Sequence, residues 1–427
     1  MEHTSHFVAY TRGKTMPSTL LPSDDVPADA VGRLRQRGSN QVGMRQFNER
    51  VVLQALRAHG SAPKAELARL TGLTAQTIGI ITSRLDEDGL LIRQAPVRGR
   101  VGQPSVPLGL NPDGAFAIGI KIGRRSTDWL LVDFTGRVRQ RIVLHYPFPD
   151  AGLLLPAIEA NLKQLLDGLW GLRDRVVGVG VAAPYQLGGW HRMLGLTENQ
   201  SRAWNDTDLG ARVQAMTGLP VSFAKDTTAA CVAELLQGKG REIPSFLYLF
   251  LDTFIGGGLV IHSHLHRGQA GNAGAVASLP LGVAGVGEGV PPQLVSQASL
   301  WDLEQRFREH GLDAKAAYDE RAMQAPWVSY TQEWIARAAM ALAMCIVSGT
   351  AFLDLDAVVI DGVVAPELLQ NLLTQTREAL QAYNTEGLQA LPRLEAGSIG
   401  SDARALGGAL LPLHDCFAPD RDIFLKV

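Results

Sequence analysis

Gln76 and Thr77 are the residues of this chain with the side chains best suited to reading the edges of nucleic acid bases. A glutamine can form paired hydrogen bonds with adenine, and a threonine can contact a thymine methyl group or a phosphate. Thr74 and Ala75 precede them, directly after a turn at residues 71–73. The segment predicts a base-reading surface, with solvated polar residues of an ordinary helix as the alternative.

The elements around this segment have the order of a winged helix-turn-helix. Apolar residues recur at helical spacing over residues 44–58, and a second short helix is expected over residues 63–70. Gly72 supplies the tight turn, and Thr74 is a good N-cap for a third helix. Gly79 inside that helix lowers helix stability by roughly 1 kcal/mol relative to alanine. Its presence is explained either by a close approach to phosphate or as a tolerated defect. The inward face of the third helix contains Ile78, Ile81 and Leu85.

Two strands of a wing are expected over residues 90–93 and 105–108, and the loop between them carries Arg98 and Arg100. Arginine beside glycine suits a narrow, A·T-rich minor groove, while a loose linker is the alternative interpretation. Contacts with phosphates set affinity rather than sequence choice. The candidates for such contacts are Arg45, Arg50, Arg69 and Arg84.

Charge is distributed unevenly along the 427 residues, whose net charge is −2. Residues 31–104 contain 12 Lys and Arg against 5 Asp and Glu, an excess of +7 that leaves −9 for the remainder. A basic first segment on an acidic body suits nucleic acid binding by the first segment alone. The length suits about two to four domains.

The three cysteines are far apart, which argues against a disulfide framework and against a zinc site built on cysteine pairs. We also expect no signal peptide and no membrane span, and therefore a cytoplasmic protein. Residues 1–40 lack periodicity and are expected to form a flexible tail. The cysteines are Cys231, Cys345 and Cys416.

The rest of the chain contains two strand-rich cycles with helices between them. Such a pattern implies two α/β lobes with a cleft between them. The first cycle has expected strands over residues 115–122, 129–134, 138–145, 176–182 and 221–224, and helices over residues 153–171 and 227–236. The second has expected strands over residues 246–251, 259–262 and 358–360, and helices over residues 300–310, 329–352 and 401–411.

Together these segments resemble the ROK family of repressors, open reading frames and kinases, and specifically its transcriptional regulators. The resemblance covers nearly everything after residue 41 and rests on the helix-turn-helix, the strand repeat, LPVSFAKDTTAA, the triple glycine and HRGQAGNAGAVA, in that order. It implies an α/β actin-like, ribonuclease-H-like body behind the winged helix-turn-helix. The implied division is a tail (1–40), a DNA-binding domain (41–110), lobe 1 (111–230, with the helix 401–414) and lobe 2 (231–400).

The resemblance also indicates that the kinase machinery is degenerate. In the first phosphate loop of the family, the matching positions hold Lys121, Arg124 and Arg125. The second phosphate loop matches residues 252–258, which keep three glycines but place Asp252 where phosphates would lie. We therefore expect no phosphoryl transfer, because that reaction depends on positioned phosphates and metal.

Two further signatures bear on chemistry. Asp226 matches the family's catalytic base, so it is the vestigial base position, and Lys225 replaces a neighbouring asparagine. The zinc and sugar signature matches residues 275–278, Ala-Val-Ala-Ser, and the accompanying cysteine cluster is absent. We expect no catalytic residue, no cofactor and no metal, because few donors for zinc remain. A sugar kinase that uses ATP is the alternative.

Several polar residues are expected to line the cleft and bind an effector. The resemblance places a sugar-contacting asparagine near Asn199, and complementary charges suggest that Lys121 pairs with Asp226. The candidate effector residues are Asn199, Asp226, Lys225, Asn272 and Lys121, with Trp190, Trp204 and Arg202 as further lining residues.

His262, His264 and His266 alternate, so on an extended strand they would share one face. Such spacing can bind a metal, but a solvated hairpin is the preferred interpretation. The resulting hypothesis is a transcriptional regulator, most simply a repressor of carbohydrate-related genes, that binds a double-stranded operator as a homodimer or homotetramer. Its effector would be a sugar or an anionic sugar derivative, if one exists.

Overall fold

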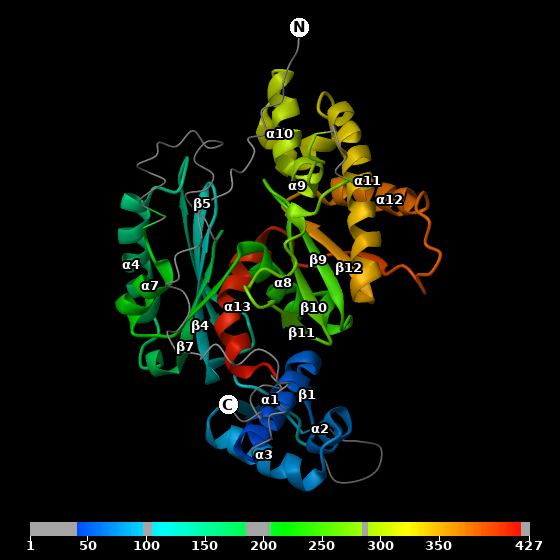
Figure 1. Cartoon of the computed structure of the whole chain (residues 1–427). Coiled ribbons are helices and arrows are strands. Elements are labelled where there is room, and N and C mark those ends of the chain that lie inside the picture. Colours follow the sequence, from blue (N-terminus) through cyan, green and yellow to red (C-terminus); the bar gives the residue numbers. More distant parts are fainter. Residues whose placement is uncertain (1–40, 97–104, 185–203, 205, 284–288, 420–427) are drawn as a thin grey trace, which may run out of the picture.

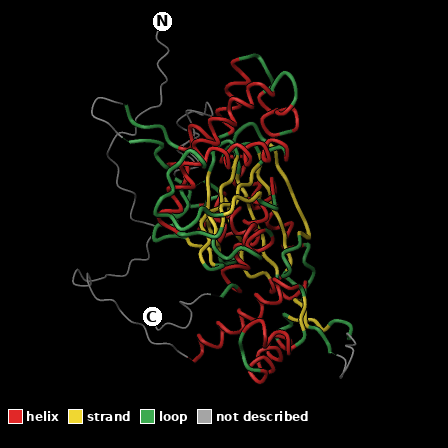
Figure 2. Tube along the Cα trace, turned by 90° about the vertical axis from the view of Figure 1, so that its right-hand side faces the viewer, coloured by secondary structure: helices red, strands yellow, loops and turns green. Residues whose placement is uncertain are grey.

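The computed structural model describes residues 41–96, 105–184, 204, 206–283 and 289–419. A small head built mainly of helices lies at one end of a larger body with two lobes (Figure 1). In the turned view of Figure 2 the helices of the head remain apart from the strands of the body. The predicted fold class, a winged helix-turn-helix followed by a two-lobed α/β body, is confirmed.

The head contains the three predicted helices, α1 (Gln41–His59), α2 (Lys64–Thr71) and α3 (Ala75–Glu87). Its sheet has the order β1-β3-β2, with all pairs antiparallel. The second wing strand starts three residues later than predicted, because Leu108 to Leu110 are the residues that pair with β2, and the first two of them also pair with β1. The strands are β1 (Ser61–Ala62), β2 (Leu91–Arg93) and β3 (Leu108–Leu110).

Each lobe has a five-stranded sheet of the same topology. The first strand of each cycle lies in the centre, pairs antiparallel with the next strand in sequence, and pairs parallel with the fourth. Lobe 1 contains β4 (Phe116–Ile122), β5 (Ser126–Asp133), β6 (Val138–His145), β7 (Val176–Ala182) and β8 (Val221–Ala224). Lobe 2 contains β9 (Phe246–Leu251), β10 (Gly256–Ile261), β11 (His264–His266), β12 (Ala357–Gly362) and β13 (Arg393–Ala396).

Helices cover both faces of each sheet, so the body is built in layers (Figure 1). Helices α8 and α13 pack on each other between the two sheets, with α13 on β4 and β7 and α8 on β10. The outer faces are covered by α4 in lobe 1 and by α11 and α12 in lobe 2. The helices are α4 (Ala151–Asp167), α7 (Leu209–Thr217), α8 (Asp226–Gln237), α9 (Leu294–Ala298), α10 (Leu300–Glu309), α11 (Val328–Leu353), α12 (Pro366–Leu380) and α13 (Ala403–Phe417).

Helix α13 lies unusually close to the sheet of lobe 1. A Cβ atom on Gly119 of β4 would lie 2.3 Å from the backbone nitrogen of Ala409, and one on Gly180 of β7 would lie 1.9 Å from the carbonyl oxygen of Gly408. Only glycine permits this approach, which is why both strands carry a glycine at the crossing. Helix α13 and the sheet of lobe 1 therefore form one tightly packed unit.

Helix α11 has the length and mean hydropathy of a membrane-spanning helix. Half of its most apolar window is buried inside the protein, where it packs against α9 and α12. This burial is typical of a core helix in a globular lobe.

Candidate nucleic acid interface and inter-lobe cleft

Helix α3 is built as the sequence predicts. The Thr74 hydroxyl accepts a hydrogen bond from the Thr77 backbone N–H at 3.2 Å, so Thr74 is the N-cap, and the two hydroxyls lie 2.8 Å apart. Ile78, Ile81 and Leu85 are buried in the head. This packing turns Gln76 to the solvent side, where its amide is exposed. Thr74, Ala75, Gln76 and Thr77 thus form one outward corner at the start of α3.

Two basic side chains of the head, on α1 and in the last turn of α3, share one acidic neighbour. The guanidinium of Arg84 on α3 lies 3.4 Å from the Glu49 carboxylate, and that of Arg45 on α1 lies 3.8 Å from it. Both arginines remain nearly half-exposed, with side-chain exposures of 44% and 48%. Arg84 and Arg45 therefore lie at the solvent side of the head, as phosphate contacts require. The wing residues Arg98 and Arg100 lie outside the described residues.

The head is attached to the body through α1 and the end of α13. Nη1 of Arg50 donates to the carbonyl oxygens of Asp415 and Ala418, at 3.3 and 3.1 Å. Arg57 lies over the Phe134 ring at 5.5 Å, and that ring packs edge-to-face on Phe417. A phosphate contact by Arg50 does not fit this position, since its guanidinium belongs to the junction.

The Arg57 guanidinium is buried in this junction. Burial lowers its pKa to about 10, an effect that the nearby Asp133 carboxylate opposes. A third contact comes from Arg241, which follows α8 and donates to the carbonyl oxygen of Ala58 at the end of α1. The head therefore touches both the α13 side and the α8 side of the body.

Asp226, predicted from the resemblance as a vestigial base position, lies at the first turn of α8 and faces Arg404 of α13. The two head groups are 3.5 Å apart, and the same guanidinium bonds the carboxylate of Asp252, just after β9. Burial lowers the pKa of Arg404, but the two carboxylates outweigh it and the net shift is upward. One buried cation therefore joins Asp226 at the start of α8 to Asp252 after β9.

The predicted pair of Lys121 with Asp226 is wrong. Nζ of Lys121 lies 3.4 Å from the Asp128 carboxylate and donates to the Ser126 hydroxyl at 3.2 Å. No ion pair joins it to Asp226 within the described part of the chain. Burial, followed by the charge of Arg404, lowers the pKa of Lys121. Lys121 thus balances a carboxylate of its own lobe.

The arginines at the first phosphate-loop position reach across to lobe 2. Nη2 of Arg124 lies 2.9 Å from Glu304 of α10, whose side chain is fully buried, and Arg125 lies 3.7 Å from the same carboxylate. Arg308 and the Tyr318 hydroxyl also donate to it. Arg124 and Arg125 of lobe 1 are thus joined to α10 of lobe 2 by ion pairs.

The triple glycine is part of a strand. Gly256 to Gly258 begin β10 and pair with Tyr248 to Phe250 of β9. A Cβ atom on Gly256 would lie 2.6 Å from Thr227, and one on Gly258 would lie 2.5 Å from Cys231, both on α8. The prediction that β10 starts at residue 259 was therefore wrong, because these glycines allow α8 to pack on the strand.

Of the remaining predicted effector residues, two come together. Nζ of Lys225 donates to the side-chain oxygen of Asn272 at 2.8 Å, at the mouth of the cleft beside Asp226. Trp204 is buried and its Nε1 donates to the Pro149 carbonyl, so it packs in lobe 1 and does not line the cleft as predicted. The other three predicted lining residues, Trp190, Asn199 and Arg202, lie outside the described residues.

The three alternating histidines do not share a strand face. His262 lies in the turn between β10 and β11, in the left-handed region with a φ of 52°, and its carbonyl oxygen lies 2.6 Å from Nδ1 of His264. Only His264 and His266 lie on β11. Among the described residues no cluster of three metal-ligating side chains is present.

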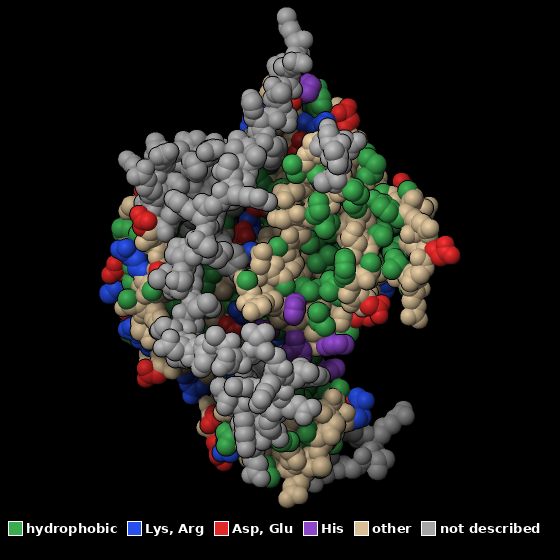
Figure 3. Space-filling view, viewed as in Figure 1, with side chains coloured by type: hydrophobic (Ala, Val, Ile, Leu, Met, Phe, Trp, Pro, Cys, Tyr) green, Lys and Arg blue, Asp and Glu red, His purple; other side chains and the backbone are tan. Residues whose placement is uncertain are grey.

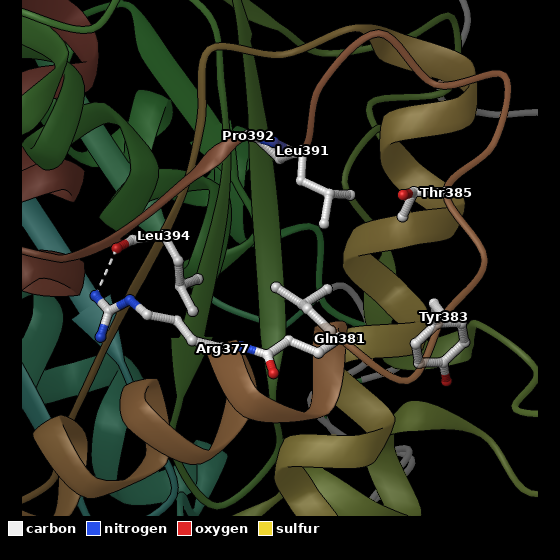
Figure 4. Close-up of a pocket in the computed structure, with 8 residues that line it drawn as sticks. Arg377, Gln381, Tyr383, Thr385, Leu391, Pro392 and Leu394 are labelled. Carbon is white, nitrogen blue, oxygen red and sulfur yellow. Dashed lines mark hydrogen bonds between the residues drawn. The ribbon is translucent and has the colours of Figure 1, made fainter.

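A separate open depression lies between the end of α12 and β13 in lobe 2 (Figure 4). Its volume is about 390 Å³, and Arg377 on its edge donates to the Leu394 carbonyl at 2.8 Å. None of the predicted effector residues lines it. Its lining residues are Arg377, Leu380, Gln381, Tyr383, Thr385, Leu391, Pro392 and Leu394.

Two residues that organise the cleft, Arg404 and Glu304, were not predicted from the sequence. For Arg404 the only sequence signal is a charged residue at the start of an otherwise apolar helix, where burial demands a partner. Glu304 lies among other charged residues of α10 and gives no such signal. The partners Asp252 and Arg124 are 152 and 180 positions away, so local spacing could not identify them.

Comparison with known proteins agrees with this architecture. The ROK family profile matches residues 117–414. The xylose repressor of Bacillus subtilis (strain 168) is 22% identical over 247 residues, which are 57% of this chain and 62% of the repressor. A transcriptional regulator of Mycobacterium tuberculosis is 30% identical over 236 residues, 54% of this chain and 52% of the regulator. The chain thus spans little more than half the length of these curated relatives.

Solved structures share the fold. A ROK family transcriptional regulator described as a homolog of the E. coli MLC protein aligns with a TM-score of 0.64 at 20% identity, covering 88% of this chain and 98% of that one. The ROK hexokinase from Thermus thermophilus aligns with a TM-score of 0.51 at 23% identity, covering 69% and 98%. The regulator alignment covers more of this chain than the hexokinase alignment does. Because the family profile spans most of the chain, the chain belongs to the ROK family.

Proposed function

We propose that this protein is a transcriptional repressor that binds a double-stranded operator through its head. The observation that carries the proposal is the solvent-facing corner at the start of α3, where Gln76 is exposed. Arg45 and Arg84 are partly exposed on the same head. The names of the two curated relatives, a xylose repressor and a transcriptional regulator, support the same function. The head would comprise residues 41–110, and the body lobe 1 (111–230 with 401–414) and lobe 2 (231–400), in the cytoplasm.

Selection of genomic DNA fragments by the purified full-length chain tests this function. We expect a small set of related sequences, because specific binding typically exceeds nonspecific binding by about 10³-fold or more. Enrichment of no fragment over random DNA would contradict the proposal. The genes next to enriched fragments would identify the regulated process, which we expect to concern carbohydrates.

The alternative, a sugar kinase, is disfavoured by Arg404. Its guanidinium forms ion pairs with Asp226, at the predicted position of the catalytic base, and with Asp252, on the predicted second phosphate loop. A kinase needs the first carboxylate to accept a proton from a sugar hydroxyl and needs the second position open to phosphate. An assay with ATP, magnesium and a panel of sugars decides between them. Robust turnover that is abolished by Asp226→Asn would establish the enzyme instead.

The effector site of the proposal lies at the cleft mouth, at Asp226, Lys225 and Asn272, with Asn199 and Lys121 as further candidates. Lys121 and Arg124 are already balanced by carboxylates. A neutral sugar therefore suits the site better than an anionic one. Calorimetry with sugars and sugar phosphates tests this, with heat expected from a neutral sugar and lost in Asn272→Ala. Heat from sugar phosphates alone would contradict the choice of ligand, and no heat at all would indicate a body without effector.

The proposed signal passes along α13. Its first turn holds Arg404 in the cleft, and its last residues bind Arg50 and pack on Phe134 at the head. Because α13 ends at the head and Arg241, after α8, also contacts the head, a rearrangement of the lobes would reach the head through these contacts. In Arg241→Ala we expect operator binding to persist but to lose its response to the effector.

The proposed assembly is a dimer through lobe 2. Met340 and Phe352 on the outer side of α11 are 58% and 88% exposed, and hydrophobic side chains gather over this helix (Figure 3). A two-headed assembly is what paired half-sites about 34 Å apart require. Light scattering checks this, with Met340→Glu expected to shift the protein towards monomer. A wild-type monomer at micromolar concentration would contradict it.

A further inference from the structure

Helix α3 carries two outward features that its capping and packing do not explain. Gly79 is the fifth residue of the helix, and Ile80 follows it with 63% of its side chain exposed. Both lie on the side opposite the buried Ile78 and Ile81, in the stripe that begins with Gln76. The stripe therefore contains the hydrogen-bonding side chain of Gln76, the backbone of Gly79 without a side chain, and the apolar side chain of Ile80.

Among the described residues, nothing requires a glycine at position 79. A Cβ atom built there meets no side chain and no other part of the fold within 4 Å, and its φ is not in the left-handed region. This contrasts with Gly72 in the preceding turn, whose φ is 69°. An alanine would fit at position 79 and would favour the helix by about 1 kcal/mol. The glycine lowers helix stability without any compensating contact in the fold.

Ile80 is unusual in a different way, because it is an apolar residue exposed to solvent. A β-branched apolar side chain on an exposed helical surface gains nothing from solvent, and its branching lowers helix propensity slightly. In the major groove, by contrast, apolar side chains contact the C5-methyl group of thymine. Removing a methyl-sized apolar contact costs about 0.8 kcal/mol, which is about fourfold in affinity.

We propose that Gly79 and Ile80 determine operator specificity: the bare backbone at Gly79 lets α3 lie close to the base edges, and Ile80 packs on a thymine methyl group. This inference rests on the proposed function. A Cβ at position 79 would hold the helix away from the groove and weaken the hydrogen bonds of Gln76 as well. The operator therefore contains a thymine next to the base pair that Gln76 reads.

Binding of Gly79→Ala to a fragment enriched by the wild-type chain and to a scrambled duplex tests the first half. We expect a higher melting temperature for the head, at least about tenfold weaker binding to the enriched fragment, and unchanged binding to the scrambled duplex. Gly210→Ala in α7 is the matched control, because its Cβ meets only a cap oxygen at 3.5 Å and it lies in the body. Unchanged binding of Gly79→Ala to the enriched fragment would overturn this half.

Replacing each thymine of the enriched fragment by deoxyuridine tests the second half, since this exchange removes only the methyl group. We expect one position in each half-site at which wild-type affinity falls about fourfold and Ile80→Ala affinity does not change. If wild type and Ile80→Ala respond alike at every position, the contact is absent. A wild-type chain that enriches no duplex contradicts the proposed function itself, and this inference falls with it.

Discussion

The outward face of α3 and the inter-lobe cleft both contain polar side chains, but these are exposed on α3 and paired with one another in the cleft. On α3 the proposed base-contacting residue Gln76 is exposed to solvent. Gly79 and Ile80 make the helix less stable than alanine at the same positions would. In the cleft the charges are satisfied within the protein, with Arg404 held by Asp226 and Asp252 and Arg124 held by Glu304. An exposed polar surface is available to an external ligand, whereas the charges of the cleft are already paired with one another, as the proposed function requires of a body without kinase activity.

The largest effect on the free energy of unfolding is expected from substitution of Arg404 in the cleft. Arg404→Leu leaves two poorly exposed carboxylates without a cation, and removal of one partner of a buried pair costs about 3–5 kcal/mol. Urea denaturation of the full chain should show this loss in free energy of unfolding. The triple variant Arg404→Leu/Asp226→Asn/Asp252→Asn should recover most of it. Arg404→Leu with wild-type stability would mean that the cleft is not held together by this cluster.

On the head, the largest effect is expected from Gln76→Ala. Loss of a paired hydrogen bond to a base should cost about 1–3 kcal/mol on an enriched fragment. Binding to a scrambled duplex should not change, because phosphate contacts remain. Fluorescence anisotropy at fixed salt measures both affinities. Equal losses on the two duplexes would assign Gln76 to the backbone instead.

Arg84→Ala tests the electrostatic part of DNA binding by the head. We expect weaker binding to every duplex and a slope of log affinity against log salt that is lower by about one. Titrations at several salt concentrations measure the slope. Arg393→Ala, at the exposed start of β13, is the matched control and should leave the slope unchanged. A loss confined to the enriched fragment would contradict the role of Arg84 as a phosphate contact.

The smallest effect concerns pH and the body alone. Burial raises the pKa of Glu234 and of Asp361, whose ordinary values are 4.5 and 3.8. The folded protein therefore binds these protons more readily than the unfolded chain, and its free energy of unfolding falls as the pH rises through the raised values. Relative to wild type, Glu234→Gln/Asp361→Asn should show a flatter dependence above pH of about 4 in urea denaturation. Identical pH profiles would show that neither carboxyl group titrates with unfolding.

Local patterns in the sequence predicted most of the elements, but no element was expected where α7, α12 and β13 lie. Alternating and continuous apolar runs gave β6, β7, β8 and β9 with the bounds that the structure has, and the Thr74 cap was predicted from its residue type alone. These features depend on neighbours in sequence. The triple glycine was misjudged because its reason is the approach of α8, which only the folded chain reveals.

The site was less predictable for the same physical reason. Complementary charge suggested that Lys121 pairs with Asp226, yet Asp128 on the adjacent strand is nearer to Lys121 and Arg404 on α13 is nearer to Asp226. Pairing in a cleft depends on which of several distant charges the fold brings together. A resemblance to a family fixes positions on its motifs, but it does not show which new side chains have filled a lost site.

The most direct test of the account is the affinity of the purified wild-type chain for an enriched genomic fragment and for a scrambled duplex of the same length, measured across salt concentrations. The account predicts binding to the fragment at least about 10³-fold tighter near physiological salt, with both affinities falling as salt rises. Equal affinity for the two duplexes at every salt concentration would contradict it.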